Sequence, residues 1–360
     1  MLQILSLCTL LILIFTLLPL WRHPHWLIRG MDFPRLQFMI FAAALLIAQL
    51  LLLDRETIAV QTLIFATTTC LIWQLWWILP FTLLWRKEVA TSNDNTAEKQ
   101  LSILTSNVFT PNRNAKALIS LVKQHKPDVL VTLESDQWWQ DQLKVIETDM
   151  PYSIKCPLDN LYGMHVYSRL PLDEQELCYL VEQDVPSIHV CLTLRTGDKV
   201  RAHFLHPAPP SPTENPESAE RDAELIMVAK SVAKSKQPVI VTGDLNDVAW
   251  SATTRLFRKI SGLLDPRVGR GAFNTFHVDY PIARWPLDHL FHSSHFTLRD
   301  IQRLPSIDSD HFPLLTRLVF TFPHGSDQEG IKAEAEEEKW SEEITNQKQV
   351  SKNDVPTPAE

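Results

Sequence analysis

The chain is organised around one segment, Pro238-Val-Ile-Val-Thr-Gly-Asp-Leu-Asn-Asp247. Four β-forming residues lead into Gly243, which predicts a buried strand that ends at a turn. Asp244 and Asn246 follow two residues apart, and residues two apart on an extended segment point the same way. Because burying both polar side chains would be costly, we expect them to face a cleft that holds a cation or a polar ligand.

Other predicted strands also end in polar residues. The segments 101–107 and 128–134 are predicted strands joined by a helix over 114–125, which places Asn107 and Glu134 at equivalent strand ends. Short antiparallel strands are expected over 164–168, 187–195 and 199–206. The other expected elements are helices over 135–150, 215–235 and 251–260 and closing strands over 287–292, 296–299 and 314–322. Two halves that each mix buried strands with helices predict an α/β fold, a two-sheet sandwich with outer helices.

The amino-terminal quarter has a different composition. Three runs without charge cover residues 2–21, 36–53 and 57–85. Each is long enough to cross about 30 Å of hydrocarbon as a helix. The first run could be a signal peptide, but it lacks a basic start and a cleavage site of small residues, which favours a retained span. Aromatic residues at the ends of the runs argue against a buried soluble bundle.

The basic residues of the short loops predict the orientation of these spans. Arg22, Arg29 and Arg35 follow the first run and Arg86-Lys87 follow the third, whereas Arg55 lies on the opposite side. Since cytoplasmic loops carry an excess of Lys and Arg, we expect a multi-pass protein of the cytoplasmic membrane with its carboxyl-terminal part in the cytoplasm. Five scattered cysteines show neither a zinc pattern nor a disulfide framework.

Composition divides the chain into four parts. We expect a transmembrane region over 1–90, a polar linker over 91–98, a catalytic domain over 99–322 and a tail over 323–360. The tail contains ten acidic and four basic residues and is expected to be acidic and largely disordered, with a short helix as an alternative. Residues 95–322 carry a net charge of −3, so strong binding of duplex nucleic acid is not expected.

The polar residues at the strand ends form a set that suits metal-assisted phosphoryl chemistry. Taken singly, each could be a turn former, a helix cap or a hydrogen-bonded surface residue. Taken together, their oxygen ligands suit Mg²⁺ or Mn²⁺, and the lack of Cys or HExxH patterns argues against zinc. The set comprises Asn107, Glu134, His206, Asp244, Asn246, Asp288, Asp310 and His311.

These residues resemble the endonuclease/exonuclease/phosphatase superfamily over residues 99–322. The resemblance rests on motifs in a specific order: Ser106-Asn107, Val131-Thr-Leu-Glu134, Gly163–Leu172, Arg221, Gly243-Asp-Leu-Asn246, Pro286-Leu-Asp-His289 and Ser309-Asp-His311. It implies a four-layer α/β sandwich, here preceded by three transmembrane helices, and it is similar to membrane-anchored bacterial members of the superfamily.

The resemblance also implies a role for each residue. Glu134 would be the principal metal ligand, assisted by Asn107 and Asp310. Asp244 would orient or deprotonate the attacking water, and Asn246 would hold that water or a phosphate oxygen. The catalytic set would be completed by two phosphate-contacting histidines and one orienting carboxylate, namely His206, His311 and Asp288.

The sequence departs from DNA-repair members of the superfamily. Phe109 stands where those members often carry an acidic residue, and His206 stands where nucleases carry Tyr. Asp308 precedes Ser309 where Gly is commoner. The loop over 265–284 is rich in Gly, Arg and Phe and offers Arg270, Asn274 and Arg284 for substrate binding. Alternatively, this loop is an ordered surface loop packed by its own Phe residues.

We therefore expect a membrane-anchored, Mg²⁺-dependent phosphoesterase that hydrolyses a phosphodiester by in-line attack of an activated water. Membrane anchoring favours a lipid or membrane-proximal phosphoester substrate. The enzymatic alternatives are a nuclease acting on DNA or RNA and a phosphomonoesterase acting on inositol or sugar phosphates. An inert membrane adaptor is the alternative from another class, and it is disfavoured because no member of the expected metal and water-activating set is missing.

Overall fold

Two mixed β-sheets form the centre of the molecule. The computed structural model describes residues 1–321 and 328–358. One sheet has six strands in the order β10-β11-β1-β2-β4-β3, and the other has five in the order β5-β6-β7-β8-β9. The strands of the first are β1 (Gln100–Asn107), β2 (Val129–Leu133), β3 (Tyr152–Cys156), β4 (Met164–Ser168), β10 (Phe296–Arg303) and β11 (Leu314–Phe320). Those of the second are β5 (Leu172–Cys178), β6 (Ser187–Thr193), β7 (Lys199–Leu205), β8 (Val239–Asp244) and β9 (Asp288–His292).

Each sheet contains one parallel pair of strands at its centre. β1 runs parallel to β2, with Ile103 opposite Val129, and β7 runs parallel to β8, with Ala202 opposite Ile240. The other pairings are antiparallel. Because the carboxyl ends of parallel strands lie at the same edge, the residues that follow β1, β2, β7 and β8 are brought to one end of the sandwich.

The core lies between the inner faces of the two sheets. Ile103 and Val131 from one sheet pack in the same cluster as Phe204 and Ile240 from the other. Burying each such side chain stabilises the fold by about 1.5–3 kcal/mol. A polar contact also joins the sheets near the site, since the hydroxyls of Thr105 and Thr242 are 3.1 Å apart.

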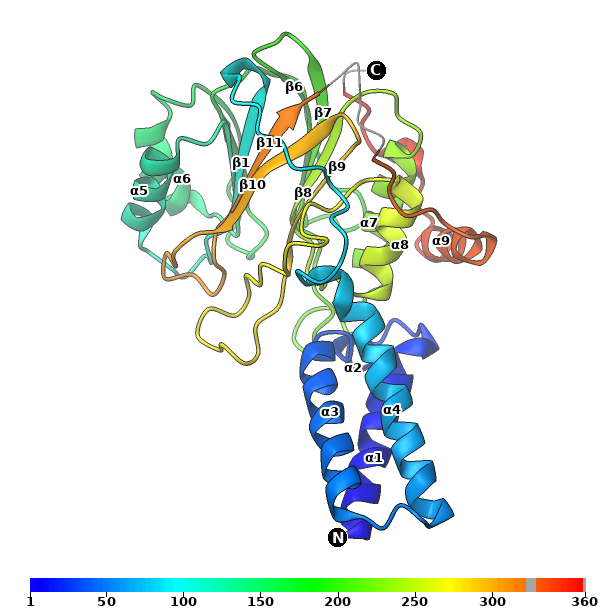
Figure 1. Ribbon diagram of the computed structural model, residues 1–360. Coiled ribbons are helices and arrows are strands. Elements are labelled where there is room, and N and C mark those ends of the chain that lie inside the picture. The colour runs from blue at the N-terminus through cyan, green and yellow to red at the C-terminus, as the bar shows by residue number, and fades with distance from the viewer. Residues whose placement is uncertain (322–327, 359–360) are drawn as a thin grey trace.

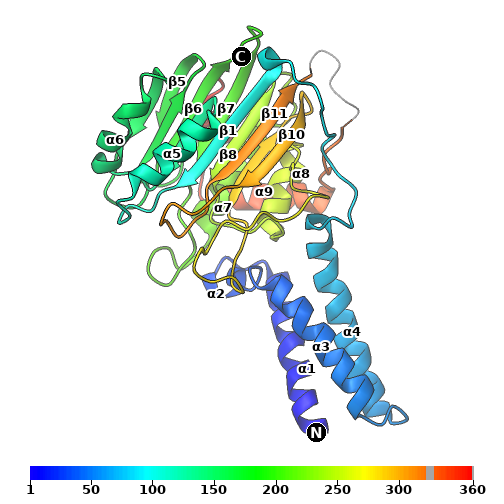
Figure 2. The same ribbon diagram turned by 60° about the vertical axis from the view of Figure 1, so that its left-hand side comes forward.

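Helices cover the outer faces, and the predicted four-layer α/β sandwich is confirmed (Figure 1, Figure 2). The six-stranded sheet is covered by α5 and α6, with Leu118 and Trp139 in the layer between. The five-stranded sheet is covered by α7 and α8, with Val228 and Phe257 in the equivalent layer. The bounds are α5 (Ala115–His125), α6 (Gln137–Leu143), α7 (Ala219–Val232) and α8 (Ala252–Ser261), with short 3₁₀ turns at Ala97–Lys99, Lys144–Ile146 and Lys352–Asp354.

The acidic tail is not disordered over the part that the structure describes. Residues 335–347 form helix α9 (Ala335–Gln347), which packs outside α7 and α8. Ile344 joins an apolar cluster with Ile226, and Lys259 pairs with Glu337 at 2.6 Å. Disorder was the wrong expectation for this helix, because Ile344 packs against α7 and Lys259 pairs with Glu337. Residues 322–327 and 359–360 lie outside the described residues.

Three apolar helices form a bundle below the domain (Figure 1). Stretches long and apolar enough to cross a membrane cover Leu2–Trp21, Arg35–Leu52 and Ile58–Phe81, close to the predicted spans. Inside the bundle, Gln49 Nε2 donates to the hydroxyls of Thr9 and Thr67, at 2.8 and 3.0 Å. The helices are α1 (Leu2–Leu17), α2 (Trp26–Gly30), α3 (Arg35–Leu52) and α4 (Ile58–Ile78), with 3₁₀ turns at Leu18–Trp21 and Leu79–Phe81.

The bundle is attached to the end of the sandwich at which the parallel strands finish (Figure 1, Figure 2). Trp26 N donates to Pro216 O at 3.0 Å, and Ser218 N donates to Pro24 O at 2.8 Å. Trp250 Nε1, in the segment after β8, donates to Asp32 O at 2.8 Å. The loop between α1 and α3 therefore contacts the segments that follow β7 and β8.

The predicted linker packs against the domain. Ser92 N donates to Leu298 O at 2.8 Å, and Leu298 N donates to Ala90 O at 2.9 Å, so this segment runs beside β10. Val89 is buried in the core between the sheets. The chain therefore passes from α4 into β1 through a packed segment.

Candidate active site

Four of the predicted site residues meet at the end of the parallel strands. Asn107 is the last residue of β1, and its Nδ2 donates to Glu134 Oε1 at 2.7 Å and to Asp244 Oδ2 at 3.3 Å. The same Asp244 oxygen lies 3.4 Å from His311 Nε2. Side chains from both sheets thus share one polar cluster.

Glu134 is held in a strained backbone conformation with one free oxygen. Its φ is 57°, in the left-handed region that non-glycine residues rarely adopt. Thr110 Oγ1 donates to its backbone carbonyl at 2.7 Å. Burial raises the pKa of Glu134 to about 7, and Asp310 and Asp244 add to this shift. Its buried Oε2 has no hydrogen-bond partner among the described residues, so this oxygen is available to a cation.

Asn107 has a different orientation from that of a direct metal ligand. Its Oδ1 accepts a hydrogen bond from Phe109 N at 3.0 Å, which turns Nδ2 towards Glu134 and Asp244. In this arrangement Asn107 bridges two carboxylates as a donor. To bind a cation through oxygen, its amide group would have to turn over.

His311 lies between two carboxylates. Its Nδ1 donates to Asp288 Oδ2 at 2.8 Å, and its Nε2 faces Asp244. Burial lowers the pKa of His311, but Asp244, Asp288 and Asp310 outweigh this effect and raise the pKa to about 10. The ring of Phe276 packs against the imidazole, with centroids 4.9 Å apart. His311 is therefore an oriented proton donor at neutral pH.

Asp244, Asp288 and His311 also offer three possible metal-ligand atoms within 4.8 Å of one another. We assign them as a hydrogen-bonded proton-donor group instead. His311 Nδ1 is engaged by Asp288, and a protonated imidazole cannot bind a metal ion. The free oxygen of Glu134, with hard oxygen donors around it, fits Mg²⁺ or Mn²⁺ better.

Asp310 lies near Glu134, in the Ser309-Asp-His311 loop. Ser309 Oγ donates to Asn107 O at 2.8 Å and accepts from His311 N at 3.1 Å, so it fixes the loop to the end of β1. Asp308 has a φ of 67°, which explains why Gly is commoner at this position in the superfamily. Asn114 Nδ2 donates to Asp308 Oδ2 at 2.7 Å and holds the turn.

His206 follows β7 and borders the same cluster. Burial lowers its pKa to about 4, with Asp244 opposing and His311 adding to the shift, so the ring is neutral. Its buried Nδ1 has no partner among the described residues. The ring of Tyr162 lies 5.4 Å from the imidazole, and its hydroxyl donates to Glu214. Tyr162 was not predicted, although it directly precedes Gly163 of the quoted motif.

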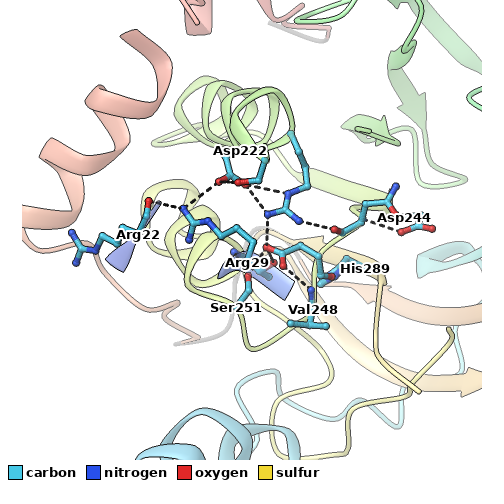
Figure 3. A network of polar contacts seen from close by, with 12 residues as sticks. Arg22, Arg29, Asp222, Asp244, Val248, Ser251 and His289 are labelled. Atoms are coloured by element: carbon cyan, nitrogen blue, oxygen red, sulfur yellow. Dashed lines mark hydrogen bonds and ion pairs between the residues drawn. The ribbon is translucent and has the colours of Figure 1, made fainter. Parts of the chain in front are cut away.

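A chain of polar contacts connects the site to the loop between the first two apolar spans (Figure 3). Asp244 Oδ1 accepts from Asn246 N at 3.0 Å, and Asn246 O accepts from Arg221 Nη1 at 2.7 Å. Arg221 Nη2 donates to Asp222 Oδ1 at 2.8 Å. Arg29, on α2, lies 3.5 Å from Asp222 Oδ2. Asn246 therefore acts here through its backbone, while its side chain donates to the carbonyl of Pro207 at 3.0 Å.

Arg221 and Asp247 are the centre of this network. Their side chains are 3.5 Å apart and both are buried. Asp247 Oδ2 accepts from Ser251 Oγ, and its backbone carbonyl accepts from His289 Nε2 at 2.9 Å. His289 Nδ1 in turn faces Arg267 Nη2 at 2.7 Å. This network fixes the turn that carries Asp244. Its role was not predicted, although Arg221 is a quoted motif and Asp247 directly follows another.

The three residues predicted to bind substrate lie in different places. Arg284 stacks over Phe312 at 4.9 Å, next to His311, and donates to Val278 O at 2.6 Å. Asn274 accepts from Arg303 at 2.8 Å through its backbone. Arg270 instead donates to Val89 O at 2.6 Å and to Thr91 Oγ1 at 2.9 Å, in the segment after α4. The expectation of a phosphate contact for Arg270 is therefore not supported, because its guanidinium is used to hold that segment.

Solved structures share this architecture at low sequence identity. A humanized D. rerio TDP2 has a TM-score of 0.51 and 19% identity over 61% of this chain and 99% of its own. The human Nocturnin catalytic domain has a TM-score of 0.50 and 17% identity, covering 62% of this chain and 95% of its own. An endonuclease/exonuclease/phosphatase from Beutenbergia cavernae has a TM-score of 0.51 and 15% identity, covering 62% of this chain and 72% of its own.

At this identity the likeness shows the fold alone. No curated protein matches the chain in sequence. The sequence profile of the Endonuclease/Exonuclease/phosphatase family, however, matches residues 104–311. This range extends from β1 to His311 and includes the polar cluster of Asn107, Glu134, Asp244 and His311. This chain belongs to the Endonuclease/Exonuclease/phosphatase family and is a hydrolase that acts on phosphoester bonds.

Proposed function

We propose that this protein is a membrane-anchored phosphodiesterase that depends on Mg²⁺ or Mn²⁺. The observation that carries the proposal is the cluster of Glu134, Asp244 and His311, in which a free carboxylate oxygen lies beside an oriented proton donor. Hydrolysis of a phosphoester needs charge neutralisation on the phosphate, an activated water and a stabilised leaving oxygen. This cluster offers a group for each requirement.

Glu134 and Asp310 are the residues proposed to hold the cation, with Asn107 assisting after its amide turns. When bound, the cation would neutralise charge on the phosphate and act as a Lewis acid. Asp244 is proposed to orient and deprotonate the attacking water, because its carboxylate accepts from Asn246 N and Arg221 holds the carbonyl of Asn246. His311, aligned by Asp288, is proposed to donate to a phosphate oxygen. His206 is proposed to contact the phosphate from the other side through its free nitrogen.

The substrate is proposed to lie at the membrane surface. The loop that carries Phe276 also contacts the membrane bundle, since Gln37 Nε2 donates to Ile282 O at 2.6 Å and the ring of Phe33 lies 5.5 Å from Trp285. Ile282 is 85% exposed, which is unusual for a large apolar residue and favours contact with lipid. Because Phe276 packs on His311, the same loop forms one wall of the site. A phosphoester in a lipid headgroup would reach this wall directly.

We infer a cytoplasmic catalytic domain from the basic loops. Arg22 pairs with Glu336 of α9, and Arg86 and Lys87 line a cavity together with residues of α8, so these basic residues lie where the bundle meets the domain. A periplasmic reporter fused to the carboxyl terminus should therefore be inactive. Periplasmic reporter activity would overturn this orientation.

The proposed reaction is tested on the full-length protein in detergent. Bis(p-nitrophenyl) phosphate, p-nitrophenyl phosphate, a single-stranded DNA oligonucleotide and phospholipid vesicles are offered after chelation and again after addition of Mg²⁺. We expect hydrolysis of diesters that returns with Mg²⁺ and is lost in Asp244→Asn. The matched control is Asp141→Asn, which removes an exposed carboxylate on α6.

Each alternative corresponds to a distinct outcome of this panel. Release of phosphate from the monoester alone would replace the proposal with a phosphomonoesterase. Cleavage of the oligonucleotide alone would replace it with a nuclease, and the solved D. rerio TDP2 complex with single strand DNA product shows that a relative of this fold binds such a strand. An adaptor without activity would leave every substrate intact with and without Mg²⁺.

A further inference from the structure

A cavity of about 670 Å³ lies where the bundle meets the catalytic domain. It is lined by the end of α4, the segment after it, α8 and the residues that follow Asp247. Trp76, Trp77 and Trp85 form part of the wall. The candidate span Ile58–Phe81 ends within this lining, and tryptophans at the end of a span mark the membrane–water boundary. The cavity is therefore at the level of the lipid headgroups.

Three cations in the lining lack an anionic partner. Among the described residues, the side chains of Arg86, Lys87 and Arg255 make neither an ion pair nor a hydrogen bond to an acceptor. Arg255 is instead stacked over Trp77, with its guanidinium carbon 5.4 Å from the ring centroid. Burial and the nearby Arg258 lower the pKa of Arg255, and Glu337 and Glu334 oppose this shift without forming an ion pair with it. An anion in the cavity would supply a direct partner.

The acidic residues of the lining do not supply it. Glu88 pairs with Arg258, and Glu329 pairs with Lys332 at 2.8 Å. Of the four cations of the wall, only Arg258 has a carboxylate partner, so Arg86, Lys87 and Arg255 are left without one. A cavity with this charge selects an anionic ligand.

An apolar stripe on α4 leads into the cavity. Phe65, Ile72 and Trp76 are exposed large apolar residues, and their spacing of seven and four positions places them on one face of the helix. Such a face in a membrane span contacts acyl chains. The cavity thus offers cations and tryptophans for a headgroup, next to an apolar surface for its chains.

We propose that this cavity binds an acidic phospholipid, with its phosphate between Arg86, Lys87 and Arg255 and its acyl chains along α4. Arginine binds phosphate through paired N–H groups, and clusters of basic residues next to a span bind acidic headgroups. The site is separate from the proposed hydrolytic centre and does not depend on its activity. It would attach the domain to the membrane surface beside Trp250, which also lines the cavity.

Native mass spectrometry of the full-length protein in detergent tests this site. The protein is titrated with phosphatidylglycerol and with phosphatidylcholine of the same chain length. We expect at least tenfold preferential retention of one phosphatidylglycerol. The Arg86→Gln/Lys87→Gln variant, whose positions are exposed and need not disturb the fold, should lose most of this preference, and adding Arg255→Gln should abolish it.

The matched control is Lys116→Gln/Lys123→Gln, which removes two exposed cations from α5 and should leave the preference unchanged. Equal retention of the two lipids would overturn the proposal, as would full retention of phosphatidylglycerol in the triple variant. Soluble glycerol 3-phosphate provides a further arm. If it binds as tightly as the lipid, the site recognises a free phosphate and the lipid assignment is wrong.

Discussion

The two sides of the candidate active site differ in whether their buried polar atoms have hydrogen-bond partners. On one side, Glu134 Oε2 and His206 Nδ1 are buried without a partner. On the other side, Arg221 and Asp247 are buried in a network that reaches from Asp244 to Arg29. A buried polar atom without a hydrogen bond costs about 1–3 kcal/mol, so the first side is stable only if a ligand or a proton satisfies it. The second side needs no ligand and serves as a scaffold.

Glu224 shows that a free oxygen alone does not make a site. It lies on α7, two residues from Asp222, and its Oε1 is also without a partner among the described residues. Burial raises its pKa to about 8, so a proton satisfies this carboxyl group at neutral pH. Glu134 differs because Asp244, Asp310 and His311 act on it electrostatically. The grouping of such residues, more than the free atom, indicates binding and catalysis.

The largest expected effect follows from Glu134→Gln. We expect a loss on the order of 10³-fold in kcat, because this change removes the oxygen proposed to hold the cation. The Tm should be unchanged or higher, since the substitution removes a carboxylate that interacts unfavourably with Asp310 and Asp244. Diester hydrolysis and thermal unfolding of the same preparation provide the two measurements.

The distinction between a ligand-binding side and a scaffold side would fail if Glu134→Gln unfolded the protein or retained its activity. The first result would place Glu134 among the scaffold residues. The second would remove it from the site. Asp141→Asn again serves as the control for loss of a carboxylate.

Arg221→Leu is expected to lower the stability of the protein, which Glu134→Gln should not do. Removing this guanidinium leaves Asp247 buried without its ion-pair partner, which should lower the free energy of unfolding by about 3 kcal/mol. For a domain of this size, the Tm measured in detergent should fall by roughly 10 °C. Activity should fall as well, because the turn that carries Asp244 loses its support.

Arg221→Lys provides the matched variant. It keeps the charge but loses the planar guanidinium that contacts Asp222 and Asn246 together, so we expect a smaller loss of Tm. An unchanged Tm in Arg221→Leu would contradict the scaffold role of Arg221 and Asp247.

The smallest expected effect concerns pH and Glu224. Its pKa in the folded state, about 8, lies above the ordinary value of 4.5, so the folded protein binds more protons at this residue than the unfolded chain does. Its contribution to the free energy of unfolding is therefore lost as pH rises from about 5 to 8, with a slope of about 1.4 kcal/mol per pH unit. Glu224→Gln removes this slope.

The measurement is the difference in Tm between the wild type and Glu224→Gln at several pH values. The variant should gain relative stability as pH rises through this window and gain nothing at pH 4. A difference independent of pH would show that Glu224 is ionised in the fold. In that case a bound cation or an ordered donor must satisfy it.

Strand endings made much of the cluster predictable. Asn107, Glu134 and Asp244 come at the ends of apolar runs, and parallel strands bring such ends together. Strands β3 and β5 were not predicted. β5 is an edge strand whose middle residues are exposed, so Leu172–Cys178 carries no alternating pattern to reveal it.

Other features depend on contacts that the pattern of residues does not encode. The direction of Arg270 could not be read from a loop rich in Gly, Arg and Phe, and its guanidinium binds the segment after α4. Helix α9 has little apolar character of its own and is stabilised by α7, α8 and Lys259. Tyr162 reaches His206 from a distant loop.

The fold class, the apolar helices and the residues available for chemistry follow from the amino-acid sequence, because strand periodicity and strand-end polarity are local properties. Which of these residues have free atoms, and which are fully hydrogen-bonded, depends on the folded arrangement. Asp244 and Asp247 are three positions apart in one motif, yet one faces His311 and the other Arg221. That division depends on neighbours far away in the chain, since packing of β9, α7 and the loop before β11 supplies the partners.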